Sequence, residues 1–181
     1  MTVAANDSRL EHALGEVTRW FFDDYLNRYI SVVSGTCEEG PEFILDYWAC
    51  PVHVSSPRTN RRLSEPRDAA GMLAETQARL RGAGYTHTEV LDSRLTVFHP
   101  GGAAIEVIWS RRAAQTKIER LAVHFQAVRS GEGWRAIAIQ ELDTAAQSLD
   151  EVWPVHRGQH RDLGPPTAHA SSIRRTGRRP S

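Results

Sequence analysis

The stretch AAIEVIWSR, residues 103–111, lies in the part of the chain that decides the fold. From Tyr85 onward the hydrophobic pattern changes to a period of two, which is the period of a β-strand. Four strand-like segments follow, at residues 86–99, 103–113, 118–129 and 134–142. Short turns such as Pro-Gly-Gly at 100–102 separate them, so consecutive strands are expected to pair as an antiparallel meander.

The residues before Tyr85 follow a helical period instead. Ser8 and Glu11 form a capping box, and the broad apolar stripe after it predicts a first helix that packs on the sheet. Pro41 opens a second, short helix, and Pro66 opens a third. Helices followed by strands predict a single α+β domain, and 181 residues suffice for one hydrophobic core.

Further segments complete the domain organisation. Residues 52–56 are predicted to form a short strand, and residues 57–62 a polar turn. The domain is expected to span residues 8–155, after a flexible N-terminus at residues 1–7. Residues 156–181 are rich in polar residues and proline and cannot bury a core, so they are predicted to be a disordered basic tail.

The net charge of the chain is zero, but the charge is unevenly distributed. The basic tail holds six arginines against one aspartate, a net charge of +5, which leaves −5 on the rest of the chain. An acidic body with a basic tail argues against a nucleic-acid-binding core. Nucleic acid is therefore not expected as a partner.

The sequence also bears on the compartment. No apolar run approaches the roughly 20 residues that span a bilayer, so no membrane association is expected. The N-terminus lacks the basic and apolar stretches of a secretory signal. Cys37 and Cys50 do not amount to a disulfide framework, so we expect a cytoplasmic protein with reduced thiols.

Cofactor-binding patterns are missing from the sequence. Gly101 and Gly102 lie in a predicted hairpin turn and lack the following helix of a phosphate-binding loop. His156 and His160 have the i, i+4 spacing of metal ligands, but their polar stretch offers no third ligand. We therefore expect neither a cofactor nor a metal.

The order of the elements resembles that of NTF2-like proteins, and three short sequence motifs are similar to those of SnoaL-like domains. LRGAGY at residues 80–85 ends the third helix, AAIEVIWSR forms the long strand, and GWRAIA at 133–138 resembles a closing Gly-Trp-Arg-Ile signature. The resemblance covers about residues 10–143. It implies a cone in which three N-terminal helices pack on a curved antiparallel sheet and enclose an apolar pocket.

Members of this superfamily differ widely in activity. They include ketosteroid isomerase, scytalone dehydratase, limonene epoxide hydrolase and polyketide cyclases, and many members dimerise through the outer face of the sheet. The fold therefore does not select one chemistry.

The resemblance also suggests which strand residues face the pocket. Matching the closing strand steps puts the family's acidic position at Gln126, with His124 on the same pocket face. Leu121, Val123 and Phe125 would then face outward, which suits a dimer or a covering segment. On the next strand, Glu141 would point inward.

These positions carry the catalytic hypothesis. His124 is predicted to transfer a proton near pH 7, with Glu141 orienting it or acting as a base with a raised pKa. Gln126 departs from the family pattern, because an amide only donates and accepts hydrogen bonds, so it is predicted to bind and polarise the ligand. His53 is predicted to bind the ligand, but its strand carries no acid, so ketosteroid-isomerase chemistry is disfavoured. The alternative for His124 is a core or interface residue.

Aromatic residues are expected to form the pocket wall or the core. Tyr25 and Tyr29 lie on the first helix, where the family places a pocket phenol, and Tyr29 could stabilise an oxyanion. Trp48 and Trp109 are predicted to be wall residues. Arg111 could bind an anion, or be a solvated residue at a strand end.

The sequence thus predicts a pocket that binds a small hydrophobic molecule, in a homodimer, with cofactor-free acid–base catalysis of the lyase, isomerase or hydrolase type. The alternative is a non-enzymatic homodimeric binding or assembly module, because the family's acids are missing. A cavity below about 300 Å³ would favour this alternative, because ligand pockets usually exceed that volume.

Overall fold

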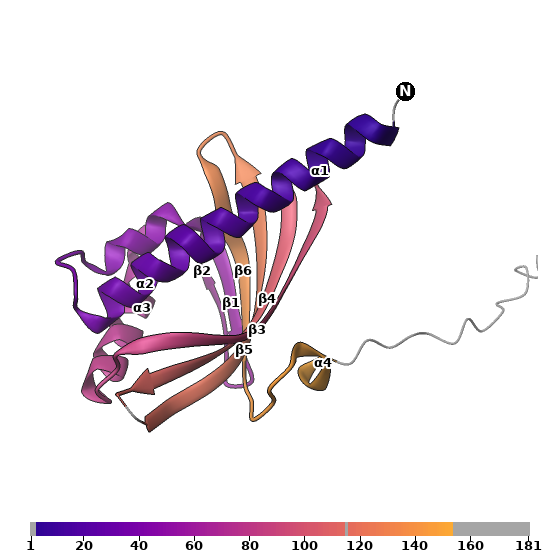
Figure 1. The fold of residues 1–181 in the computed structure, drawn as a ribbon. Coiled ribbons are helices and arrows are strands. Elements are labelled where there is room, and N and C mark those ends of the chain that lie inside the picture. The colour runs from indigo at the N-terminus through magenta and orange to yellow at the C-terminus, as the bar shows by residue number, and fades with distance from the viewer. Residues whose placement is uncertain (1–2, 115, 154–181) are drawn as a thin grey trace, which may run out of the picture.

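The computed structural model describes residues 3–114 and 116–153. A single curved sheet forms one side of the domain, and the N-terminal helices lie across its concave face (Figure 1). Its six strands follow the order β2-β1-β6-β5-β4-β3. The predicted α+β cone is confirmed.

The first helix is long and has three parts. α1 (Val3–Thr18) passes into a short π-helix, η1 (Arg19–Tyr25), which continues as α2 (Leu26–Ser34). α2 stops at Gly35, whose φ of 79° lies in the left-handed region that glycine adopts without strain.

The predicted helix start is wrong. The capping box at Ser8 lies inside α1, which already begins at Val3. A capping residue marks the start of a helix only where the residues before it are not helical. Ala4 and Ala5 are strong helix formers, so the helix extends past Ser8 toward the N-terminus.

The next two helices occur as predicted. η2 (Pro41–Asp46) is a short 3-10 helix, and α3 (Pro66–Gly82) is an α-helix of 17 residues. Both have proline in the first turn, where its missing N–H leaves no helical bond unmade.

The predicted polar turn at residues 57–62 is largely a strand. β1 (Trp48–Ser56) turns at Pro57 and Arg58 and pairs antiparallel with β2 (Thr59–Leu63). Residues 60–62 of this edge strand are exposed, so the strand lacks the apolar alternation by which strands are found.

The other four strands form the predicted antiparallel meander. They are β3 (His87–His99), β4 (Gly102–Ala113), β5 (Thr116–Ser130) and β6 (Gly133–Asp143). β1 pairs with β6 in parallel, so the sheet is mixed at that junction.

After β6 the chain folds back onto the outer face of the sheet. The short helix α4 (Leu149–Val152) was not predicted. It buries Leu149 against Ile108 and Ala122 in a small second cluster, and Asp92 accepts a hydrogen bond from the Leu149 N–H at 2.8 Å. The predicted tail at 156–181 lies outside the described residues.

The main core lies between η1 and the inner face of the sheet. Phe125 of β5 packs edge-on against Phe21 and Tyr25, with ring centroids 5.0 and 5.9 Å away. Tyr29 stacks on Trp109 of β4 at 6.3 Å. In the described part of the chain, no helix is both long and apolar enough to cross a membrane.

We expect Phe125→Ala to lower the free energy of unfolding by about 3–5 kcal/mol, because it leaves a cavity in this aromatic layer. Phe98→Ala is the matched control, since Phe98 is 63% exposed and its loss should change stability by less than about 0.5 kcal/mol. Urea denaturation followed by tryptophan fluorescence measures both. Equal losses in the two variants would contradict this assignment of the core.

Candidate functional site

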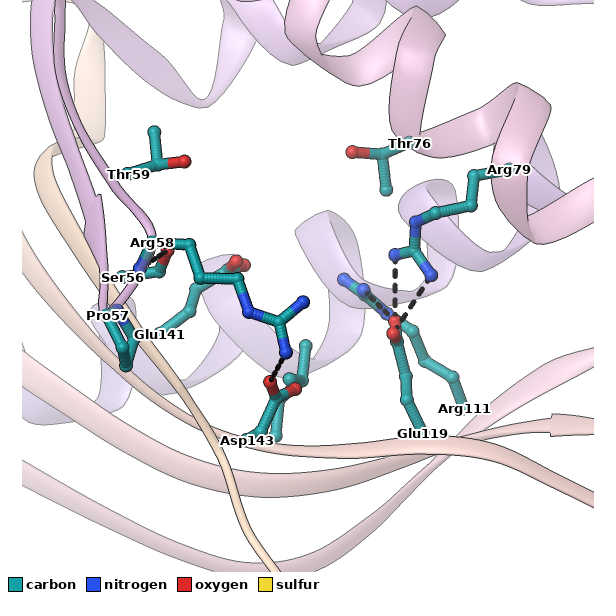
Figure 2. A pocket seen from close by; sticks show the side chains of 11 residues that line it. Ser56, Pro57, Arg58, Thr59, Thr76, Arg79, Arg111, Glu119, Glu141 and Asp143 are labelled. Atoms are coloured by element: carbon teal, nitrogen blue, oxygen red, sulfur yellow. Dashed lines mark hydrogen bonds and ion pairs between the residues drawn. The ribbon is translucent and has the colours of Figure 1, made fainter.

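A polar cavity of about 320 Å³ opens between α3, the β1–β2 turn and the sheet (Figure 2). We call it the mouth. Its charged lining consists of three arginines and three acids: Arg58, Arg79, Arg111, Glu119, Glu141 and Asp143. The mouth therefore differs from the apolar pocket that was predicted.

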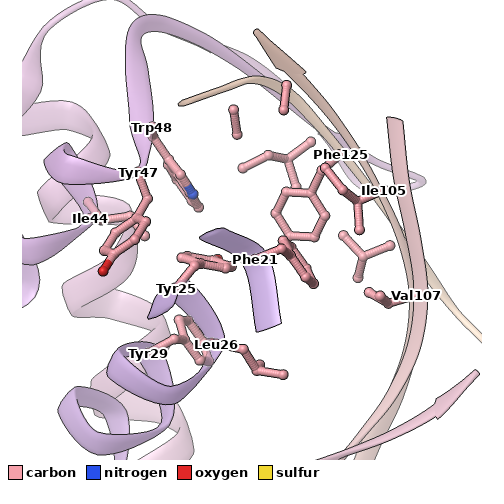
Figure 3. Packing of buried hydrophobic residues seen from close by; sticks show 14 of the residues in the cluster. Phe21, Tyr25, Leu26, Tyr29, Ile44, Tyr47, Trp48, Ile105, Val107 and Phe125 are labelled. Atoms are coloured by element: carbon pink, nitrogen blue, oxygen red, sulfur yellow. The ribbon is translucent and has the colours of Figure 1, made fainter. Parts of the chain in front are cut away.

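A second, much smaller cavity of about 50 Å³ continues from the mouth toward the aromatic core. We call it the throat. Thr76, Arg111 and Glu141 line both cavities. The rings of Tyr25, Trp48 and Phe125 converge here (Figure 3), so the protein's own side chains fill most of the apolar part of the cone.

Arg111 forms the floor of the mouth and is only 4% exposed. It donates a hydrogen bond to Glu119 at 2.6 Å and another to the Tyr29 hydroxyl at 2.9 Å. Its guanidinium also lies over the Tyr29 and Trp109 rings, at 5.7 and 5.6 Å from their centroids. The alternative that Arg111 is a solvated strand-end residue is therefore wrong.

Two arginine side chains form ion pairs with the Glu119 carboxylate. Arg79 of α3 donates to its two carboxylate oxygens at 2.9 and 3.0 Å, and Oε1 also accepts the bond from Arg111. Burial raises the pKa of Glu119, but the hydrogen bonds and charges of Arg79 and Arg111 outweigh it and hold the pKa below its ordinary value. Glu119 is thus ionised at neutral pH, and two guanidiniums share one carboxylate.

Glu141 has a different environment. No side chain or backbone group in the described part of the chain forms a hydrogen bond or an ion pair with it within the usual distances. Burial raises its pKa above the ordinary value of 4.5, although the charge of Arg111 opposes this. A carboxyl group with a raised pKa at a cavity wall is a stronger base than an ordinary glutamate and is suited to general acid–base catalysis.

Tyr29 can supply a hydrogen bond beside it. Its oxygen accepts the bond from Arg111, which leaves its own O–H free to donate. Burial raises the pKa of Tyr29, so the phenol stays protonated. A buried donor polarised by a cation can stabilise an oxyanion.

The structure brings together five of the predicted site residues. Tyr25, Tyr29, Trp48, Trp109 and Glu141 all line the throat. Whether any of them binds a ligand or takes part in catalysis stays a prediction.

The prediction that His124 and Gln126 of β5 face the pocket is wrong. His124 lies on the outer face, with Nδ1 3.4 Å from a Glu106 oxygen and the ring edge-on to Trp153. Gln126 is exposed. The packing of Phe125 against the first helix directs Phe125 inward, and alternation then turns both neighbours outward.

His53 also lies away from the cavities. It is exposed and hydrogen-bonds Asn60 of the edge strand. Val52 and Val54 are buried in the core, so alternation turns His53 outward.

The pairing of Arg111 with Glu119 was not predicted from the sequence. The two residues are direct cross-strand partners, two residues beyond the partners Trp109 and Leu121. A register counted from the turn at Ala113–Thr116 would have paired Arg111 with Ile118, because an irregularity between Arg111 and Arg112 shifts the pairing by one residue. Within the described residues, no three His, Cys, Asp or Glu side chains form a group that could hold a metal.

Comparison with known proteins gives the family. The family described as NTF2-like protein (DUF6841) matches residues 15–144, and the chain belongs to it. A search of curated proteins gives no match.

Solved structures share the fold at low identity. An NTF2-like protein with a cystatin-like fold from Novosphingobium aromaticivorans has a TM-score of 0.57 and 18% identity, over 81% of this chain and 94% of its own. A candidate scytalone dehydratase from the same organism has a TM-score of 0.53 and 13% identity, over 76% and 88%.

A third similar structure is named as an association domain and not as an enzyme. It is a candidate calcium/calmodulin-dependent protein kinase II association domain from Xanthomonas campestris, with a TM-score of 0.53 and 9% identity, over 72% of this chain and 86% of its own. Proteins named as an enzyme and as an association domain thus share this fold, so the function must be argued from the site.

We expect Glu141→Gln to raise the free energy of unfolding at pH 7 and to leave it unchanged near pH 4. An acid whose folded-state pKa is raised contributes its full stability below the unfolded pKa of about 4.3 and loses it as the pH rises through the folded-state pKa. The measurement is urea denaturation of both proteins at several pH values.

The matched control is Asp143→Asn, two residues along the same strand and 69% exposed. We expect it to change stability by less than about 0.5 kcal/mol at either pH. A destabilised Glu141→Gln protein at pH 7 would mean that the carboxylate is stabilised by the fold.

Proposed function

We propose that this protein binds a small molecule in the mouth and throat and transfers a proton to or from it through Glu141. The observation that carries the proposal is the position of this carboxyl group. It lies on the boundary between a polar cavity and an aromatic one, without a partner in the described part of the chain. Glu141 is partly exposed to the cavity, and a carboxyl group with a shifted pKa at a cavity wall is typical of functional sites.

The two cavities define the kind of ligand. The throat, at about 50 Å³, accepts only a small apolar group. The mouth, at about 320 Å³, is just within the range of ligand sites and favours polar atoms. The proposed ligand is therefore amphiphilic, in contrast to the wholly hydrophobic molecule that the sequence predicted.

The proton transfer uses groups that lie around one space. Ionised Glu141 accepts a proton from an acidic C–H or O–H of the ligand, and the electron pair moves onto a ligand oxygen. The Tyr29 O–H, polarised by Arg111, donates a hydrogen bond to that oxyanion. Glu141 then returns the proton, to another atom for an isomerisation or to a leaving group for an elimination.

The second candidate is a non-enzymatic binding or assembly module. It is favoured by the small volume of the throat, because side chains fill most of the apolar part of the cone. A homodimer in the cytoplasm remains part of both proposals.

The test is a thermal-shift screen of the full chain against small amphiphilic metabolites. A ligand present at 100 to 1,000 times its Kd should stabilise the protein by about 3–4 kcal/mol. For a ligand that is turned over, Glu141→Gln should lower kcat by about 10²–10⁴-fold and Tyr29→Phe by about 10-fold or more.

Gln140→Ala is the control, since Gln140 is the exposed neighbour of Glu141 on the same strand. It should leave binding and turnover unchanged. Binding without turnover, unaffected by Glu141→Gln, would support the non-enzymatic module, and a screen without a ligand would contradict small-molecule binding.

A further inference from the structure

The floor of the mouth carries an excess of positive charge. Arg79 and Arg111 both bind Glu119, and this group of three side chains has a net charge of +1. Arg111 is buried, so water screens its charge weakly.

Glu141 does not neutralise this excess by contact. The structure places no ion pair within 4.0 Å between Glu141 and either arginine in the described residues. Glu141 lies across the cavity, on β6 near the β1–β2 turn (Figure 2). A positive floor and two further carboxyl groups, Glu141 and Asp143, therefore face the same space, and Asp143 lies beside Arg58.

The rim of the mouth holds free hydrogen-bond donors. Figure 2 shows the hydroxyl groups of Thr59 and Thr76 pointing into the space between the hairpin and α3. Neither hydroxyl is hydrogen-bonded to another described residue. The Arg58 side chain is 87% exposed, and its ion pair with Asp143 is long, at 3.8 Å. Such a pair is weak, so Arg58 can turn toward a ligand.

We infer that the mouth selects a small organic anion, a carboxylate, which binds Arg58 and the hydroxyls of Thr59 and Thr76 above the positive floor. The inference rests on the proposed function, because it names the ligand class of the same pocket. Arginine matches a carboxylate in geometry as well as charge. A cationic ligand would add to the excess charge of the floor.

Anion binding would then be coupled to a proton. An ionised Glu141 repels a carboxylate in the same cavity, so the anion binds more tightly when Glu141 is protonated. The affinity should therefore rise as the pH falls toward the pKa of Glu141, which burial raises. By linkage, binding of the anion favours the protonated form of Glu141.

The first experiment compares anions with neutral molecules of the same shape. Isothermal titration calorimetry of the full chain uses butyrate and benzoate against butyramide and benzamide. We expect each carboxylate to bind at least about tenfold more tightly than its amide, as for a charge-assisted hydrogen bond. Amides that bind as tightly would overturn the anion inference and leave small-molecule binding intact.

The second experiment locates the anion. Arg58→Gln should weaken benzoate binding about threefold to tenfold. Arg67→Gln is the matched control, because Arg67 is also 87% exposed and pairs loosely, at 3.9 Å, with Asp68. Equal affinities in both variants would place the anion elsewhere and overturn the inference.

The third experiment tests the proton. Butanesulfonate keeps its charge at every pH used, so between pH 5.5 and 8 only the protein titrates. Its affinity should rise as the pH falls, and Glu141→Gln should bind more tightly at pH 8 with a flatter pH profile. An unchanged profile in the variant would overturn the coupling. If neither these five probes nor the metabolite screen gave a ligand, the proposed function itself would fall.

Discussion

The contact between Phe125 and the first helix is the constraint on which the rest of the site depends. Phe125 packs against Phe21 at 5.0 Å and so fixes which face of β5 looks into the cone. Strand pairing passes this orientation to both neighbours, because residues opposite each other share a face. It thereby brings Arg111 opposite Glu119, and Glu141 opposite Val123, onto the inner face.

The same aromatic layer sets the volume left for a ligand. Close packing of large rings fills the apolar part of the cone and leaves about 50 Å³. Beyond the rings, β4, β5 and β6 present charged side chains in place of apolar ones. A buried arginine is costly unless it is paired, and Glu119 and Tyr29 supply the partners of Arg111. Glu141 has no such partner in the described residues, which is why it stands out.

Much of the fold could be predicted from local patterns. The meander follows from a period of two with short turns, and the helix ends from Gly35, Pro41 and Pro66. The edge strand β2 was missed because exposed polar residues give no alternation. Tyr29 and Glu141 line the throat, whereas His124 and Gln126 lie on the other face of β5, away from both cavities.

The sequence by itself determined the type and order of the elements, because turn residues and hydrophobic periods act over a few neighbouring positions. It did not determine the face of β5, since both faces of this strand carry apolar residues and a shift of one residue exchanges them. Only the tertiary structure decided that, through contacts between Phe125 and residues about 100 positions earlier. The burial of Arg111 and the isolation of Glu141 follow from the same packing, because desolvation depends on every element around a group.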